Sequence, residues 1–276
     1  MSDDTSPLLG TKAYDSPSVF DPANLLREGR RQRGRPDIDV PAVCVLDPDG
    51  DIVRHLIGAR RATEHPGWGC YHTILWVLDL DGVEVGIIGC AVGASFAVLI
   101  AEQLAASGCQ LVISVTSAGS VTPVADPPYF VVIDRALRDE GTSLHYLAPS
   151  QWAHAPRNLV AALESSLDHL AQPVVTGSTW TTDAPYRETT EAIDHARSLG
   201  VVAVEMEAAA LYAYATALDR DVICVAHVTN TMATEGDDFE KGEADGALDA
   251  LQLVSAIIGQ LSGSINSMRF PNGSVT

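Results

Sequence analysis

The chain has 276 residues, a length that fits one large domain or two small ones. Hydrophobic residues make up 46% of it, which is ample material for a core, and no apolar run reaches the ~18 residues that a membrane helix needs. The formal net charge of −19 argues against nucleic-acid binding, because so negative a surface repels phosphate backbones.

Residues 1–36 differ in composition from the rest, since they hold six of the 17 basic residues and show no sustained periodicity. We expect them to form a flexible N-terminal arm, followed by one folded domain over residues 37–276. The polar, acidic first residues do not fit a secretory signal. The five cysteines lack metal-ligand spacing and predict buried free thiols and a cytoplasmic protein without a metal site.

From residue 41 onward the pattern alternates between strands and helices. The apolar run at 42–46 predicts a buried strand that ends at the turn Asp47-Pro48-Asp49-Gly50. Two β-rich runs at 73–80 and 83–89 are separated by Asp81-Gly82, a dipeptide typical of a tight hairpin. An apolar helix follows at 94–107, and Gly108 ends it.

The second half continues this alternation. We expect strands at 111–116, 129–134, 173–177, 201–204 and 221–228, and helices at 157–171, 188–198, 206–218 and 245–261. The order predicts an α/β fold, a three-layer α/β/α sandwich around a mostly parallel or mixed sheet. Ligands of open α/β sheets bind beyond the carboxyl ends of the strands, so the residues after each strand are the first candidates for a site.

Glu205, Met206 and Glu207 stand where a strand passes into a helix. Negative charge is favourable at a helix N-terminus, so one explanation of the carboxylates is the helix dipole, with Met206 in the core. The functional alternative is that paired carboxylates accept hydrogen bonds from two adjacent hydroxyls while Met206 backs a sugar ring. The residues by themselves leave both explanations open.

Small residues dominate two other turns that follow strands. The turn at 89–95 offers backbone N–H groups to an anion but lacks the spacing of a dinucleotide site. The segment Val115-Thr116-Ser117-Ala118-Gly119-Ser120 carries small hydroxyl residues that fit hydrogen bonding to an oxyanion or a sugar, and a plain turn explains it equally well.

Two polar segments offer the mixture of groups that a planar base needs. Residues 180–189 combine an aromatic ring, donors and an arginine just before a helix, although capping of that helix is an alternative explanation. Asn230 ends the last predicted strand and presents a donor and an acceptor together, with a purely structural role as the alternative.

Together these segments resemble the nucleoside phosphorylase superfamily, which includes uridine phosphorylases, purine nucleoside phosphorylases and nucleosidases acting on methylthioadenosine. The resemblance runs from about residue 41 to residue 258 and is nearest to the uridine-phosphorylase-like branch. The segments that carry it are 93, 117–119, 138–146, 181–189 and 204–209. It implies an α/β/α sandwich around a mixed, partly barrel-like sheet, and a homodimer or a homohexamer built as a trimer of dimers.

The resemblance also implies a reaction: cleavage of the N-glycosidic bond of a nucleoside, with inorganic phosphate as co-substrate and no metal or organic cofactor. It implies that Glu207 is catalytic and binds the ribose hydroxyls, with Met206 packed on the sugar and Glu205 assisting. The other implied residues are Thr182, Tyr186, Arg187 and Asn230 for the base and Gly50, Arg54, Ser117 and Gly119 for phosphate, with Arg187 and Asn230 also catalytic.

The phosphate side departs from the family pattern. Ser114 stands where the resemblance predicts an arginine, and the early turn carries Asp47, Asp49 and Asp51, whose charges oppose an anion. Asn230 stands where hexameric purine enzymes have an aspartate, and an amide cannot act as a general acid.

We therefore expect a nucleoside phosphorylase that gives a free base and (deoxy)ribose 1-phosphate, with two alternatives. A hydrolytic nucleosidase that uses water is favoured by the missing arginine. A catalytically disabled nucleoside-binding protein is opposed by the retained Glu205, Met206 and Glu207.

Overall fold

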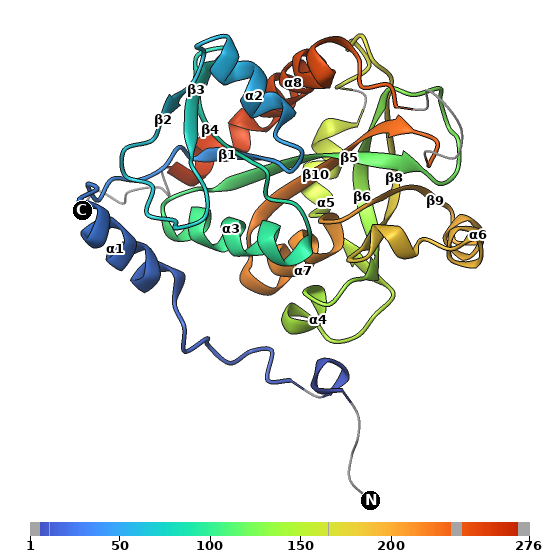
Figure 1. The fold of residues 1–276 in the computed structure, drawn as a ribbon, viewed down its shortest axis with the longest axis horizontal. Helices are drawn as coiled ribbons and strands as arrows, with labels where there is room; N and C mark the ends of the chain where they lie inside the picture. The colour runs from blue at the N-terminus through green and yellow to red at the C-terminus, as the bar shows by residue number, and fades with distance from the viewer. Residues whose placement is uncertain (1–5, 11, 165, 233–238, 270–276) are drawn as a thin grey trace, which may run out of the picture.

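The computed structural model describes residues 6–269 except residues 11, 165 and 233–238. The start of the predicted arm and the end of the predicted domain therefore lie outside the described residues. Figure 1 shows the order of the elements. The helices are α1 (Pro22–Arg33), α2 (Asp51–Gly58), α3 (Ala94–Ala106), α4 (Ser143–Tyr146), α5 (Arg157–Leu163), α6 (Thr190–Ser198), α7 (Ala208–Leu218) and α8 (Ala247–Arg269), with short 3-10 turns η1 (Pro7–Leu9), η2 (Pro185–Arg187) and η3 (Glu243–Gly246). The strands are β1 (Val43–Asp47), β2 (Thr63–Glu64), β3 (Trp76–Leu80), β4 (Val83–Gly89), β5 (Leu111–Ser120), β6 (Tyr129–Asp139), β7 (Trp152–His154), β8 (Val174–Thr182), β9 (Val201–Glu205) and β10 (Asp221–Asn230).

The strands form one mixed sheet in the order β10-β6-β8-β9-β5-β1-β4-β3-β2, with β7 added to β6. Strand β10 also pairs with β5, so β5, β10, β6, β8 and β9 close into a five-stranded barrel. The expected mixed, partly barrel-like sheet is therefore confirmed. Parallel pairing of β5 with β1 and β10 brings the carboxyl ends of these three strands to one edge.

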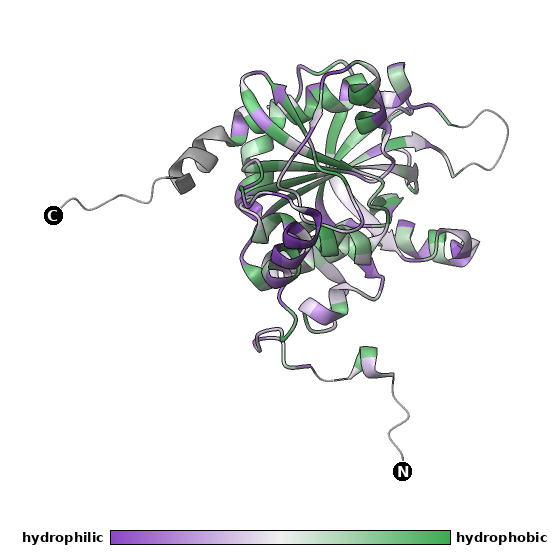
Figure 2. Cartoon of the chain, turned by 60° about the vertical axis from the view of Figure 1, so that its left-hand side comes forward, coloured by the Kyte–Doolittle hydropathy of each residue, from purple (hydrophilic) through white to green (hydrophobic). Residues whose placement is uncertain are grey.

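Helices cover both faces of the sheet, as the expected three-layer fold requires. One buried cluster joins the sheet to α1, α3 and α7, and a second joins it to α2, α5 and α8. Figure 1 shows α3 and α7 below the sheet and α2 and α8 above it, and the strands between them are mostly hydrophobic in Figure 2. Within the described residues, no helix has the length and apolar character needed to cross a membrane.

The hairpin predicted at Asp81-Gly82 is confirmed. Strands β3 and β4 pair antiparallel, with Leu80 opposite Val83. The two turn residues have φ values of 53° and 84°, which is the left-handed pair that a two-residue hairpin loop needs.

The N-terminal arm is the main correction to the expected architecture, because residues 22–33 form a helix docked on the body. Leu26 of α1 is fully buried, and the backbone of Gly29 lies so close to Gly69 that a Cβ there would meet its carbonyl oxygen at 2.2 Å. Arg30 donates to the Gly67 carbonyl at 2.8 Å and to Ser107 Oγ at 3.1 Å. The basic run is thus part of a packed helix, whose contacts with distant residues leave no local periodic signal.

Other differences concern element boundaries. Helix α2 was not expected, and it begins directly after the turn at 47–50 because Asp47 accepts from the backbone N–H groups of Gly50 and Val53. Helix α5 ends at Leu163, well before residue 171. Strands β5, β6 and β8 run four to five residues beyond their apolar stretches, because the barrel pairs their polar ends as well.

Candidate active site

Glu205, at the end of β9, is a buried carboxylate whose hydrogen bonds are internal to the protein. One oxygen accepts from Thr179 Oγ1 at 3.0 Å and from Thr181 Oγ1 at 2.5 Å. The other accepts from the backbone N–H groups of Glu207 and Ala208, both at 2.7 Å. Glu205 is 3% exposed and holds the start of α7, so these bonds occupy the oxygens that a sugar hydroxyl would need. The helix-terminus explanation thus accounts for Glu205.

Glu207 is held differently, by groups from two other parts of the chain. Its Oε1 accepts from the backbone N–H of Gly93, which precedes α3, at 2.7 Å. Its Oε2 accepts from Thr116 Oγ1 on β5 at 2.9 Å and from the backbone N–H of Met206 at 3.3 Å. The residue is 1% exposed. Burial, and after it the charge of Glu205, raise the pKa of Glu207 well above its ordinary value.

The ends of β5 and β10 bring three further predicted residues beside one another. Ser117 lies opposite His227 in the register, and Gly119 lies opposite Asn230. A Cβ on Gly119 would meet Asn230 Oδ1 at 3.3 Å, so the amide and the glycine backbone touch. The Asn230 oxygen accepts from the backbone N–H of Met232 at 2.9 Å. The sequence signal at these strand ends thus marks one continuous region.

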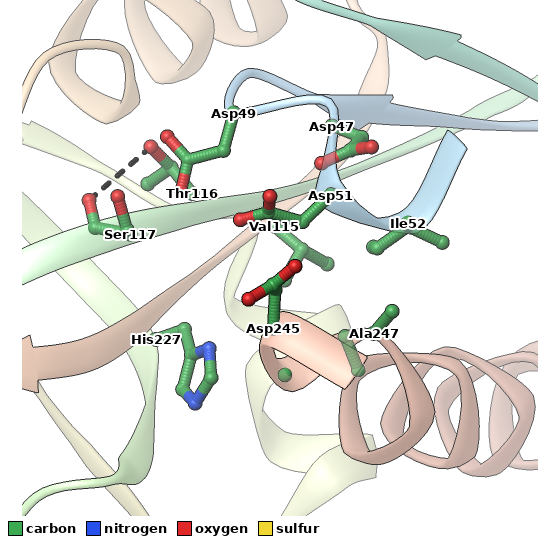
Figure 3. A pocket seen from close by; sticks show the side chains of 12 residues that line it. Asp47, Asp49, Asp51, Ile52, Val115, Thr116, Ser117, His227, Asp245 and Ala247 are labelled. Carbon is green, nitrogen blue, oxygen red and sulfur yellow. Dashed lines mark hydrogen bonds between the residues drawn. The ribbon is translucent and has the colours of Figure 1, made fainter. Parts of the chain in front are cut away.

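An acidic pocket lies next to this region, at the ends of β1, β5 and β10 (Figure 3). It has a volume of about 20 Å³, which is room for one water molecule. Figure 3 shows side chains of Asp49, Asp51 and Asp245 gathered around it, with Thr116 and His227 on its other sides. The lining residues are Asp47, Asp49, Asp51, Ile52, Val115, Thr116, Ser117, His227, Asp245, Gly246, Ala247 and Ala250.

Two cations neutralise part of this negative charge. Lys241 donates to Asp51 at 2.6 Å and to Asp49 at 3.3 Å. Arg54, a predicted phosphate ligand, is paired with Asp51 and donates to the Asp49 carbonyl oxygen at 3.0 Å, with 61% of its side chain exposed. Gly50 adopts a φ of 77° at the start of α2. Neither predicted residue lines the pocket itself, although both are neighbours of the aspartates that do, and the arginine already has a carboxylate partner.

Burial shifts the protonation of two groups in the acidic pocket in opposite directions. Desolvation raises the pKa of Asp47 to about 7. The charges of Asp49 and Asp51 also raise it, and the hydrogen bonds from the backbone of Val53 and Gly50 lower it. Desolvation, and next the charge of Lys241, lower the pKa of His227 to about 4. His227 stacks on Phe130 with ring centroids 4.4 Å apart and is neutral at neutral pH. At neutral pH the pocket is therefore lined by a neutral imidazole and by an Asp47 carboxyl that is about half protonated.

The residues predicted for the base are not brought together in the same way. Thr182 is 4% exposed and its Oγ1 accepts from the backbone N–H of Ala184, so it shapes the turn after β8. Tyr186 and Arg187 lie on η2 and are exposed, Tyr186 to 99%. Their role toward the base stays a prediction.

Some residues of the site were missed by sequence reasoning. Lys241 carries no motif, and Thr116 lies in the candidate segment at 115–120 without a role of its own, because each acts through a partner at least 90 residues away in the chain. Ser114, which stands where the family resemblance predicts an arginine, is 1% exposed within β5. Its side chain is therefore buried inside the sheet. In the part of the chain that the structure describes, no group of three His, Cys, Asp or Glu residues is arranged to hold a metal ion.

Comparison with known proteins identifies the family of the chain. The Phosphorylase superfamily profile matches residues 50–259. The uridine phosphorylase of Thermococcus kodakarensis is 28% identical over 190 residues, which are 64% of this chain and 68% of that protein. The guanosine phosphorylase of Halorubrum lacusprofundi is 25% identical over 135 residues, which are 49% of this chain and 56% of that protein.

Solved structures share the fold. A uridine phosphorylase from Vibrio fischeri superposes with a TM-score of 0.68 at 18% identity, covering 82% of this chain and 95% of that one. A purine nucleoside phosphorylase from Toxoplasma gondii, in complex with immucillin-H, gives 0.68 at 15% identity, with coverages of 84% and 93%. Because the family profile spans residues 50–259, which is most of the chain, this protein belongs to the phosphorylase superfamily.

Proposed function

We propose that this protein cleaves the N-glycosidic bond of a nucleoside with inorganic phosphate, giving a free base and a (deoxy)ribose 1-phosphate. The observation that carries the proposal is Glu207, a buried carboxylate held at the strand edge by Gly93 and Thr116. The similarity to a uridine phosphorylase and a guanosine phosphorylase supports the same reaction class. The reaction as proposed needs no metal or organic cofactor.

In this proposal Glu207 faces the sugar and Met206 packs on it. Departure of the base builds positive charge on the sugar ring, and an ionised carboxylate fixed beforehand stabilises that charge without reorganising. Because burial raises the pKa of Glu207, sugar binding and deprotonation of this residue are coupled. Glu205 contributes by positioning, since it holds the N–H groups of Glu207 and Ala208.

Donors near the base stabilise the negative charge that the leaving base acquires. The Asn230 amide is our first candidate: one of its N–H groups donates to Thr229 Oγ1 at 3.3 Å, and among the described residues the other has no acceptor, so it could donate to a base. Arg187, with Tyr186 and Thr182 around it, is the second candidate. An amide stabilises the leaving base by hydrogen bonding, not by proton donation.

Phosphate would bind near Ser117 and Gly119, with Gly50 and Arg54 at the start of α2, next to the aspartates of the acidic pocket. One specific observation favours water as the nucleophile instead: the pocket beside Thr116 gathers carboxylates and has room for one water molecule. A phosphate dianion would meet like charges there, and Lys241 and Arg54 are already paired with aspartates. Hydrolysis is therefore the second candidate function.

One experiment separates the two reactions. Uridine, 2′-deoxyuridine, inosine and adenosine are incubated with the protein, with and without phosphate, and the products are separated by chromatography. Base and sugar 1-phosphate formed only with phosphate support the proposal. Base and free sugar at equal rates without phosphate support hydrolysis, and no turnover of any nucleoside contradicts both.

Two further features belong to the proposal. The homodimer or homohexamer that the family resemblance implies is tested by light scattering on the purified protein. A cytoplasmic location fits the cysteines, since Cys44, Cys70, Cys109 and Cys224 are buried free thiols, which persist in a reducing compartment.

A further inference from the structure

The hydrogen bonds of Glu207 limit what its carboxylate can still accept. A carboxylate offers about four acceptor positions, two on each oxygen. On Oε2 both are used, by Thr116 Oγ1 at 2.9 Å and by the backbone N–H of Met206 at 3.3 Å. On Oε1 one is used, by the backbone N–H of Gly93 at 2.7 Å. Counting the donors of the described residues, one acceptor position of Glu207 therefore remains for a ligand.

Of these donors, Thr116 is the one that a substitution can remove. The other two are backbone groups, fixed by the start of α3 and by the turn before α7. Thr116 is 5% exposed and lies on β5, opposite Ala226 of β10, and a β-branched side chain on a strand has few rotamers. Its other partner is the Ser117 carbonyl at 3.4 Å, the dashed contact in Figure 3, which is longer than its bond to Glu207. If the Thr116 hydroxyl turns away from Glu207, it therefore exchanges a charge-assisted hydrogen bond for a weaker one to the Ser117 carbonyl.

The two common sugars of nucleosides differ in how many hydroxyls need an acceptor. The 2′,3′-diol of ribose presents two donors, whereas 2′-deoxyribose presents only the 3′-hydroxyl at this side. We propose that Thr116 is a specificity-determining residue that makes the site prefer 2′-deoxynucleosides over ribonucleosides. The proposal rests on the proposed function, in which Glu207 receives the sugar. The 3′-hydroxyl of a deoxysugar uses the one remaining acceptor position. Both hydroxyls of a ribose can donate to Glu207 only when Thr116 no longer donates to it.

The test compares two nucleosides that share a base, uridine and 2′-deoxyuridine, with inosine and 2′-deoxyinosine as a second pair. For the wild type we expect kcat/KM to favour the deoxynucleoside by about tenfold or more, the effect of one hydrogen bond to a charged group. Thr116→Val and Thr116→Ala remove the hydroxyl, and each should bring the ratio close to one. Thr116→Ser keeps the hydroxyl and should keep the preference.

Thr122→Ala is the matched control, because the Thr122 hydroxyl donates to the Val201 carbonyl and not to Glu207. It should leave the ratio at the wild-type value. Urea denaturation of each variant establishes that it is folded, and two different substitutions at position 116 guard against one that is not. A wild-type preference for the ribonucleoside, or a ratio unchanged in both folded Thr116 variants, overturns the proposal.

Failure of the proposed function gives a different result. If neither member of either pair is cleaved, with or without phosphate, the reaction itself is wrong, whatever the sugar. Titration calorimetry with the same pairs then tests the sugar preference by binding alone. Tighter binding of the deoxynucleoside that is lost in Thr116→Ala supports the role of Thr116, and equal or absent binding of both overturns it.

Discussion

Replacing Glu205 by alanine should loosen the start of α7, because this carboxylate accepts four hydrogen bonds that no other group replaces. Two come from the backbone N–H groups of Glu207 and Ala208, and two from the hydroxyls of Thr179 and Thr181. The hydroxyls can rotate toward other acceptors, but the two N–H groups stay buried and unpaired. At about 1–3 kcal/mol for each of the two unpaired groups, we expect Glu205→Ala to lower the free energy of unfolding by about 2–6 kcal/mol.

Glutamine at the same position separates shape from charge. Its carbonyl oxygen accepts from the two N–H groups, and its amide donates to the threonine hydroxyls, which also act as acceptors. Burial raises the pKa of Glu205 and so works against its charge, and losing that charge offsets part of the lost bond strength. We expect Glu205→Gln to stay within about 1 kcal/mol of the wild type in stability and within about tenfold in kcat/KM.

The assay is urea denaturation for stability, together with steady-state cleavage of the best nucleoside of the panel. Glu207→Gln is the contrasting variant: it should remain folded while kcat/KM falls by about 10²–10³. A loss below about 1 kcal/mol in Glu205→Ala would refute the structural role of the carboxylate. A loss of activity in Glu205→Gln as large as that in Glu207→Gln would show instead that Glu205 binds the sugar.

Three further changes test other parts of the structure. Arg30→Ala should lower the free energy of unfolding in urea by about 1–3 kcal/mol, because it unpairs the Gly67 carbonyl. Arg27→Ala, on the same helix with 65% of its side chain exposed, should have no measurable effect. Equal effects of the two substitutions would contradict the docking of α1. The pKa of His227 is lower in the folded protein than in the unfolded chain, so protonation of this residue destabilises the fold as the pH falls from 6.5 toward 4. Over this window His227→Gln should lose up to about 3 kcal/mol less free energy of unfolding than the wild type, measured by denaturation at each pH. Parallel curves of stability against pH would contradict the shift. Arg187→Ala should raise KM for the nucleoside far more than KM for phosphate in steady-state kinetics, and equal increases would contradict its role toward the base.

Much of the fold follows from local patterns. The alternation of apolar strands and helices predicts the α/β class, and the confirmed hairpin at Asp81-Gly82 needs only two residues that tolerate a left-handed backbone. The segment at 204–209 marks the passage from β9 to α7, and the start of α7 at Ala208 reflects a contact between neighbours, since Glu205 holds the next two N–H groups. Signals of this kind lie within a few residues, so a sequence displays them directly.

Features built from distant residues have no such signal. Closure of the barrel depends on β10 pairing with both β5 and β6, and docking of α1 depends on carbonyls and hydroxyls more than 30 residues away. The extra length of β5, β6 and β8 has the same origin, because their polar ends are strands only by virtue of their barrel partners. Propensity and periodicity describe a segment, whereas these contacts depend on what the rest of the chain brings to it.

The same distinction divides the candidate site. From the sequence, Glu205 and Glu207 are a pair of equivalent carboxylates beside Met206, and the family resemblance is what assigns them to a sugar. Only the tertiary structure separates them, since Glu205 binds its own helix while Glu207 is held by Thr116 and Gly93, 91 and 114 residues away. The acceptor positions left on a buried carboxylate are set by every donor that the fold packs around it, and those donors come from strands and turns that meet only in three dimensions.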